Sequence, residues 1–282
     1  MPELSETDAS GEIAAIYAEI RRLWAVPYVS SMQRHLATRP GWLEWVWTAL
    51  RPAFASGRAQ EAAWRAADGL EVPPLDPISR DALRVWDVDA AGERVIRTVC
   101  QAFIRVSPVN LVFSGLLQRL LQGERPHGPG LDTSAWQPPP ALARLPEMVD
   151  PAGQSTHERA VMLSLATVMA DQPFVPGLYR MLARWPRFLG HVATVLPPRL
   201  DRAAAGGLSL SLCERIDALI PAIFSELPPP PVEPPVPRSS EFASVLDALA
   251  TYRTTSPEMV IAGRLIADAL PSSETAPETA FA

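Results

Sequence analysis

Residue types that carry chemistry are few in this chain and lie far apart. The 282 residues include four histidines and two cysteines, Cys100 and Cys213, with no CxxC pair and no spacing typical of a metal site. All 25 basic side chains are arginines, which excludes a Schiff base, a P-loop and a pyridoxal phosphate site. We therefore expect neither a metal nor a cofactor.

Two charged residues are candidates for a role at a site. Asp171 ends an apolar segment just before Gln172-Pro173, where its carboxylate could orient a water; a solvated carboxylate at a helix end is the simpler interpretation. Arg253 suits the bidentate binding of a carboxylate, and an exposed arginine near a helix end is the alternative.

Four polar residues also need to be considered. Asn110 is the only asparagine of the chain, and its amide can donate to a carboxylate or a halide; a solvent-facing position within a helix is the alternative. Ser107 and Ser256 each precede a proline, which predicts that both cap the start of a helix. Ser31 is either a small polar pocket residue or the cap of a helix over 32–38.

Helices must supply the framework that positions these residues. Between Ser10 and Trp24, apolar residues recur with the i, i+3, i+4, i+7 spacing of one helix face. No comparable segment alternates with period two, so the sequence predicts an all-α protein. Similar helical segments recur at 41–54, 60–67, 90–105, 109–122, 158–170, 210–226, 242–253 and 259–270.

An internal repetition organises these segments. Residues 27–52 align without a gap to 173–198, an offset of 146, with 11 of 26 positions identical. The Ser-Pro pair at 107–108 recurs at 256–257, an offset of 149, each time four residues after an aromatic residue. The pattern predicts a tandem duplication of a helical unit of roughly 125 to 135 residues. Two such units would pack about a pseudo-two-fold axis with a pocket between them.

The repetition also sets the expected boundaries. The first helical repeat spans 1–127, a Pro-rich linker follows over 128–146, and the second repeat spans 147–271. A flexible tail is expected over 272–282. The proline-rich loop at 227–237 should run as exposed polyproline II, either as a stiff spacer or as a ligand for an SH3-like partner.

Composition limits the classes of partner. The net charge of -6 and the pI of about 5.3 argue against nucleic acid or an anionic membrane as the main partner. The N-terminal residues are polar, and the longest apolar stretch, near 160–170, is too short to span a membrane. Two widely separated cysteines fit a reducing compartment, so we expect a cytoplasmic protein.

Several short motifs form a set typical of one family. They are Leu4-Ser5-x-x-Asp8-x-Ser10-Gly11-Glu12, Val26-Pro27-Tyr28-Val29, Leu36-Ala37-Thr38-x-Pro40-Gly41, Ser107-Pro108 and Leu182-Ala183-x-Trp185-Pro186. Together they resemble the group I 2-haloacid dehalogenases, a cofactor-independent family that accepts D- or both enantiomers of 2-haloalkanoic acids. The resemblance covers nearly the whole chain and is clearest over the first 55 residues and over 170–200.

The resemblance implies both an architecture and a reaction. It implies an all-helical fold of two repeats, similar to the alkylhydroperoxidase-like bundle, in a homodimer with the active site between the repeats. The substrate is then a small 2-substituted carboxylic acid, and an aspartate activates a water that displaces halide from C2.

The chain departs from the family pattern at the base. The step that matches the family's aspartate is Leu178-Tyr179. Ser107 replaces the asparagine that the family carries just before the proline of its second motif, whereas the pocket aromatic is kept as Tyr28. The resemblance also places Arg253 where the second repeat lines the pocket. The candidate substrate-binding residues are Tyr28, Ser31, Ser107, Asn110, Leu178 and Arg253, and Asp171 is the candidate replacement base.

Two functions remain open at this point. The first is a hydrolytic dehalogenase in which Asp171 or another group replaces the missing base. The second is a catalytically silent relative that binds a small carboxylate or serves as an assembly protein. A thiol peroxidase, which needs a paired and activated cysteine, does not fit the two separate cysteines.

Overall fold

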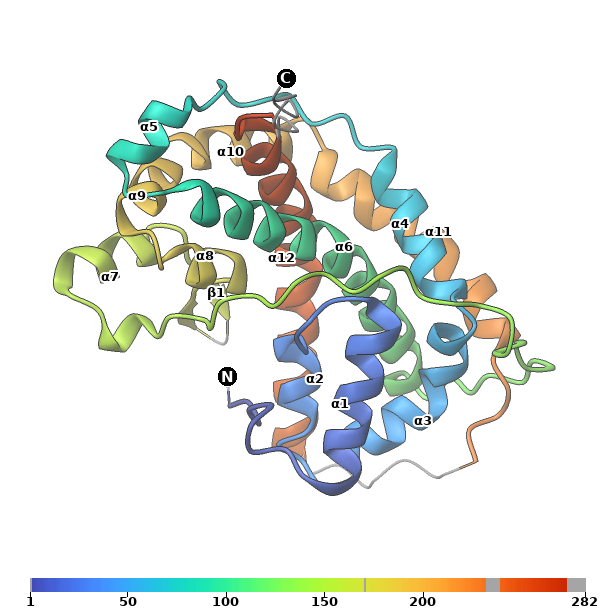
Figure 1. The fold of residues 1–282 in the computed structure, drawn as a ribbon. Helices are drawn as coiled ribbons and strands as arrows, with labels where there is room; N and C mark the ends of the chain where they lie inside the picture. Colours follow the sequence, from blue (N-terminus) through green and yellow to red (C-terminus); the bar gives the residue numbers. More distant parts are fainter. Residues whose placement is uncertain (1, 170, 232–238, 273–282) are drawn as a thin grey trace, which may run out of the picture.

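The protein is a bundle of helices, as the sequence predicts. The computed structural model describes residues 2–169, 171–231 and 239–272 (Figure 1). In chain order the helices are α1 (Gly11–Trp24), α2 (Ser31–Leu36), α3 (Trp42–Ala55), α4 (Arg58–Asp68), α5 (Arg80–Val85), α6 (Ala90–Leu121), the 3₁₀ turn η1 (Pro151–Gly153), α7 (Thr156–Leu163), α8 (Gly177–Leu182), α9 (Pro186–Val195), α10 (Pro197–Ala205), α11 (Leu208–Glu226) and α12 (Ser239–Ala269). Within the described residues, the only strands are β1 (Thr167–Met169) and β2 (Gln172–Phe174), which form an antiparallel hairpin.

Helices α6 and α12 form the centre of the fold (Figure 1). They run antiparallel, because Arg97 near the start of α6 donates to the carbonyl of Ala267 near the end of α12, at 3.1 Å. Their backbones approach closely at Gly263, where an added Cβ would lie 3.0 Å from Cγ1 of Ile104 and 3.1 Å from the carbonyl oxygen of Cys100. The same antiparallel register places the middle of α6 opposite the middle of α12.

Both central helices continue through a proline, which corrects the expectation that Ser107 and Ser256 cap helix starts. Pro108 and Pro257 lie inside α6 and α12, and the cap of α6 is Asp89, whose carboxylate accepts from the N–H of Gly92 at 2.7 Å. An interior proline costs about 3 kcal/mol, and the packing of the apolar faces on both sides outweighs that cost.

The carbonyl that Pro257 leaves without its helical donor finds a new partner. In a regular helix the N–H of residue 257 would bind the carbonyl of Arg253. That carbonyl instead accepts from the Cys213 thiol on α11, with Sγ and O 3.4 Å apart. The interruption of α12 is therefore compensated from a neighbouring helix.

The segment 158–170 was predicted to be one helix, and this is wrong at its C-terminal end. Helix α7 stops at Leu163, and the chain enters the β1–β2 hairpin, in which Val168 pairs with Pro173. Asp171, with φ of 58°, supplies a left-handed turn residue at the hairpin, a conformation that aspartate tolerates better than most residues. The β-branched Thr167 and Val168 favour the extended conformation.

Helix α6 is long and apolar enough to cross a membrane, yet most of it is buried inside the protein. Its most apolar 18-residue window is 83% buried within the protein, and no other described helix meets the same test of length and composition. Phe113 from this helix packs against Trp24 and Phe54 with ring centroids 6.0 Å apart in each pair, and all three side chains are fully buried. Helix α6 is the core helix of the first half.

Short helices correspond at the offset found in the sequence. Helix α2 spans 31–36 and α8 spans 177–182, so both ends of α8 lie 146 residues after those of α2. Residues 124–150 run in an extended path across one face of the bundle between the two halves (Figure 1). The predicted proline-rich loop is described only as far as residue 231, and the predicted tail after Ser272 lies outside the described residues.

The close approach of α6 and α12 predicts how the protein responds to bulk at Gly263. We expect Gly263→Val to lower the free energy of unfolding by about 1–3 kcal/mol, since the branched side chain overpacks against Ile104 and the Cys100 backbone. Gly190→Val in α9 is the matched control, because an added Cβ there has no neighbour within 4 Å. Urea unfolding of both variants tests this, and equal stabilities would contradict the packing described.

Candidate functional site

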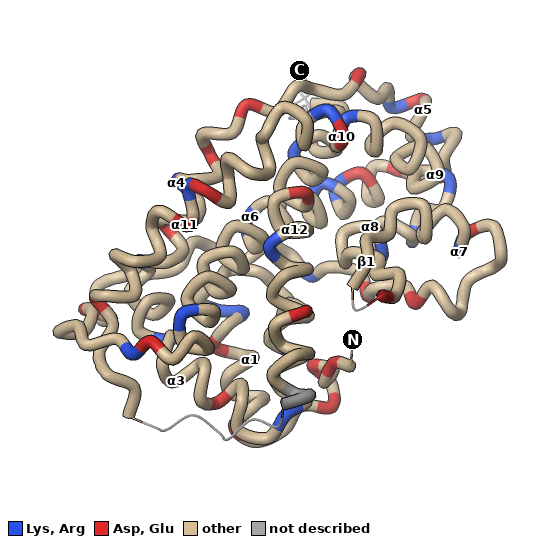
Figure 2. The backbone as a smooth tube through the Cα atoms, turned by 180° about the vertical axis from the view of Figure 1, so that it is seen from behind, with Lys and Arg blue, Asp and Glu red and all other residues tan. Residues whose placement is uncertain are grey.

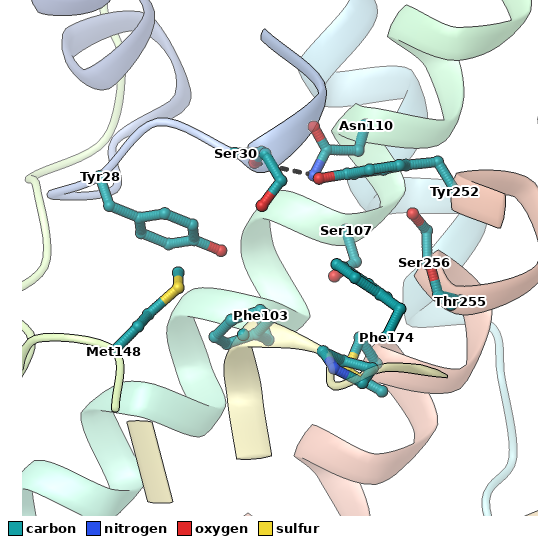
Figure 3. A pocket seen from close by; sticks show the side chains of 14 residues that line it. Tyr28, Ser30, Phe103, Ser107, Asn110, Met148, Phe174, Tyr252, Thr255 and Ser256 are labelled. Atoms are coloured by element: carbon teal, nitrogen blue, oxygen red, sulfur yellow. Dashed lines mark hydrogen bonds between the residues drawn. The ribbon is translucent and has the colours of Figure 1, made fainter. Parts of the chain in front are cut away.

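A small cavity lies where the two halves of the chain meet. Its volume is about 40 Å³, and segments far apart in the sequence close it (Figure 3). It is lined by Tyr28, Ser30, Ser31, Phe103, Ser107, Asn110, Met148, Phe174, Pro176, Gly177, Tyr252, Thr255, Ser256 and Met259.

Positions related by the two sequence offsets build most of this lining. The offset of 146 pairs Tyr28 with Phe174, and the loop before α2 with the loop before α8. The offset of 149 pairs Ser107 with Ser256, at the interior prolines of α6 and α12. The six pairs account for all of the lining residues except Met148 and Thr255: Tyr28/Phe174, Ser30/Pro176, Ser31/Gly177, Phe103/Tyr252, Ser107/Ser256 and Asn110/Met259.

The two members of most pairs differ in polarity. The members from the first half are hydroxyl or amide residues, apart from Phe103. Their equivalents in the second half include Phe174, Pro176, Gly177 and Met259, which offer no polar side-chain hydrogen bond. The cavity therefore has a polar wall and a more apolar wall.

Asn110 is the most informative group of the polar wall. The side chain is only 5% exposed, which excludes the solvent-facing alternative. Its Nδ2 donates to Oγ of Ser30 at 3.0 Å, as the dashed line in Figure 3 shows. Its Oδ1 is buried and has no hydrogen-bond partner. An unpartnered buried acceptor costs about 1–3 kcal/mol, and in Figure 3 this oxygen points away from the other lining residues, whereas Nδ2 faces Ser30.

A buried ion pair supports the polar wall from outside. Arg34 on α2 pairs with Glu3 at 2.6 Å and donates from Nη2 to Oγ of Ser31 at 3.3 Å. Both charged side chains are less than one-fifth exposed. Acidic residues of the N-terminal segment therefore lie beside α2 and α12 (Figure 2). The guanidinium orients the Ser31 hydroxyl, which lines the cavity, without entering the cavity itself.

Two tyrosines border the cavity and stay neutral. Burial raises the pKa of Tyr28 well above its ordinary value, and burial likewise raises the pKa of Tyr252. The Tyr252 hydroxyl accepts from the backbone N–H of Met32 at 2.8 Å, which ties α12 to α2. None of the described lining residues is Asp, Glu, His, Cys or Arg. The lining therefore offers hydroxyl and amide groups, and no side chain that would act as a base near neutral pH.

The structure brings four of the predicted site residues together. Tyr28, Ser31, Ser107 and Asn110 all line the cavity. Leu178 follows the lining residue Gly177, but its own side chain is fully buried and does not line the cavity.

Asp171 and Arg253 lie apart from this group. Asp171 is exposed at the turn of the β1–β2 hairpin, and it does not line the cavity. Arg253 lies within α12 and pairs with Asp217 at 2.5 Å, in a different surface groove that Arg119 also lines. Neither charged group contacts the space that the other four enclose.

The sequence also held a signal for some lining residues that it was not used to propose as substrate-binding. Applying the offset of 149 to Phe103, Ser107 and Asn110 gives Tyr252, Ser256 and Met259. Met148 carries no such signal, because it belongs to the extended segment between the halves, whose path depends on tertiary packing alone.

Comparison with known proteins gives the chain its relatives. No family model matches it. It is 29% identical over 196 residues to a configuration-inverting 2-haloacid dehalogenase of Alcaligenes xylosoxydans xylosoxydans, covering 67% of this chain and 65% of the relative. It is 24% identical over 215 residues to an (R)-2-haloacid dehalogenase of Pseudomonas putida, covering 71% of this chain and 68% of the relative. The chain thus spans just under two thirds of the first relative's length.

Solved structures show the same fold over almost the whole chain. A D-2-haloacid dehalogenase mutant in complex with D-2-CPA gives a TM-score of 0.71 at 17% identity, covering 95% of both chains. A D-2-haloacid dehalogenase in complex with L-LA gives 0.70 at 18% identity, covering 95% of this chain and 96% of the other. In sequence and in fold, the proteins that this chain resembles are thus 2-haloacid dehalogenases. The all-α architecture predicted from the sequence is confirmed, both by the helices of this structure and by the dehalogenase structures that share its fold.

Asn110 should matter more to a bound ligand than to folding. We expect Asn110→Leu to change the free energy of unfolding by less than about 1 kcal/mol, since it removes an unpartnered acceptor together with one hydrogen bond. The affinity of this variant for 2-chloropropionate should fall about tenfold, because the loss of one net hydrogen bond weakens binding by about that factor.

Calorimetric titration measures the affinity and urea unfolding the stability. Ser114→Ala is the matched control, because Ser114 is a buried residue of the same helix with an unpartnered hydroxyl and does not line the cavity. Unchanged affinity in Asn110→Leu would contradict the role of the amide.

Proposed function

We propose that the protein binds a small 2-haloalkanoic acid in this cavity and replaces its halogen with a hydroxyl group from water. The observation that carries the proposal is the small, uncharged cavity lined by positions related by the two offsets, in a chain whose relatives are dehalogenases. The named activities of the two relatives support the same substrate class.

The size of the cavity favours a short acid. A site of about 40 Å³ has room for about three waters, at roughly 10–15 Å³ for each. Drug-sized ligands occupy pockets of about 300–1,000 Å³. Acids of two or three carbons, such as chloroacetate and 2-chloropropionate, are therefore the expected substrates.

The polar wall can serve both the carboxylate and the attacking water. The hydroxyls of Tyr28 and Ser31 are donors for the substrate carboxylate, and the Arg34 contact orients that of Ser31. A lining hydroxyl such as that of Ser107 can accept one hydrogen of a water, so that the oxygen lone pair of the water faces outward. In such a low-dielectric site, fixed donors stabilise developing charge more strongly than bulk water does.

The reaction then proceeds by direct displacement. The water oxygen forms a bond to C2 as the carbon–halogen bond breaks, and the halide leaves with the electron pair. The proton of the attacking water passes to solvent water, since no described lining residue is a carboxylate or an imidazole. General-base catalysis contributes about 10²–10⁴-fold, so we expect turnover slower by that order than with a positioned carboxylate. The proposal gives Asp171 no part, because it is exposed outside the cavity.

A tandem duplication underlies the site in this proposal. The bounds of α2 and α8, the pairing of the lining residues and the antiparallel α6–α12 crossing all support two related halves about a pseudo-two-fold axis. The homodimer, the cytoplasmic location and the boundaries of the repeats stay predictions from the sequence.

Chloride release from D- and L-2-chloropropionate tests the proposed function. The purified protein should release chloride above the buffer rate, with a rate constant that is flat between about pH 6 and 9, because no lining group titrates in that range. Binding without chloride release would favour the alternative of a silent carboxylate-binding relative. If the protein neither binds the acid nor releases chloride, both functions are contradicted.

A carboxylate at position 178 should not accelerate the reaction, because the Leu178 side chain does not line the cavity. We expect Leu178→Asp to release chloride no faster than Leu178→Asn, which has the same shape but no base.

Leu178 is fully buried, so both variants should lose similar stability. The assay is therefore run at a temperature below the lower of their two melting temperatures. A rate at least about tenfold higher in the aspartate variant would show that position 178 does reach the attacking water, and would contradict the cavity described.

A further inference from the structure

Met148 is the one lining residue that comes from the extended segment between the two halves. Its thioether end reaches the cavity between Tyr28 and Phe103 (Figure 3). Helices and the loops just before them supply the rest of the lining, except for Phe174 in β2. The segment that joins the halves therefore closes the cavity with a single flexible side chain.

Two hydrogen bonds hold this part of the segment against α8. The N–H of Val149 donates to the carbonyl of Arg180 at 3.1 Å. In return, Nε of Arg180 donates to the carbonyl of Val149 at 3.0 Å. The backbone next to Met148 is thus anchored on α8, whereas the Met148 side chain itself keeps three rotatable bonds.

The tip of Met148 fills space that Gly177 leaves open. A Cβ added to Gly177 would lie 2.9 Å from Cε of Met148 and 3.1 Å from Cζ of Phe103. Because Gly177 has no side chain, the thioether packs directly over the start of α8. Phe103 and Phe174 complete an apolar end of the cavity around it, away from Asn110.

We propose that Met148 sets the upper length of the alkyl group that the cavity accepts. The inference rests on the proposed function, in which the carboxylate binds the polar wall and the alkyl group of the acid points to the apolar end. An ethyl or longer substituent would collide with the Met148 thioether, and a smaller residue at 148 would make room for it. Discrimination by one or more methylenes in an apolar pocket is worth about 10- to 200-fold in affinity or rate.

Calorimetric titration with propionate, butyrate and hexanoate tests this. The wild type should bind propionate more tightly than hexanoate, and Met148→Ala should shift that affinity ratio at least about tenfold toward hexanoate. Adding Gly177→Ala to Met148→Ala should reverse part of the shift, because the new methyl group occupies the space that the thioether has left. With the 2-chloro acids, kcat/KM should follow the same order of chain lengths.

Leu145→Ala is the matched control. Leu145 belongs to the same extended segment and packs against the core without lining the cavity, so its variant should keep the wild-type ratio. An unchanged ratio in Met148→Ala, or an equal shift in Leu145→Ala, would overturn the inference.

A neutral probe separates this inference from the proposed function. The melting temperature measured with ethanol, butanol and hexanol depends on the shape of the cavity and on no dehalogenase chemistry. Met148→Ala should be stabilised by hexanol more than the wild type is, whether or not either protein releases chloride. No chloride release with a shifted length preference would contradict only the proposed function. Chloride release with an unchanged length preference in both series would contradict only the role of Met148.

Discussion

The antiparallel packing of α6 against α12 is the constraint on which the rest of the structure depends. The missing side chain of Gly263 lets the two backbones approach, and this register sets the Ser-Pro turns of the two helices opposite each other. Those turns contribute Ser107 and Ser256 to the cavity. The same packing that forms the core therefore also brings positions related by the sequence offsets to one small space.

The two sides of that space differ in polarity. The first half of the chain contributes mainly hydroxyl and amide groups, whereas Phe174, Gly177 and Met259 stand at the offset positions in the second half. A polar end beside an apolar end suits a short molecule with one charged and one alkyl terminus. No charged side chain lines the cavity among the described residues, and the ion pair of Arg34 with Glu3 acts on it only through Ser31. Hydroxyl donors then have to offset the desolvation of a bound carboxylate.

The sequence predicted the fold class, because that class depends on local periodicity, and the repetition indicated a space between the two halves. Tyr28, Ser31, Ser107 and Asn110 meet in the cavity for that reason. It failed where tertiary packing overrides local preference: Pro108 was expected to follow a helix start, yet the buried faces on both sides of it carry α6 through.

The charged candidates failed for a different reason. Asp171 and Arg253 were chosen by side-chain chemistry, which does not reveal the direction in which a side chain points. The structure places one at an exposed hairpin turn and the other in an ion pair with Asp217. It also brings Met148 to the cavity from a segment that has no periodicity.

The most direct test of the proposed site is a crystal structure with 2-bromopropionate, in which anomalous scattering locates the bromine. We predict bromine in the cavity between Asn110 and Met148. Bromine at any other site, or none in the cavity at saturating acid, would contradict the proposal that this cavity binds the substrate.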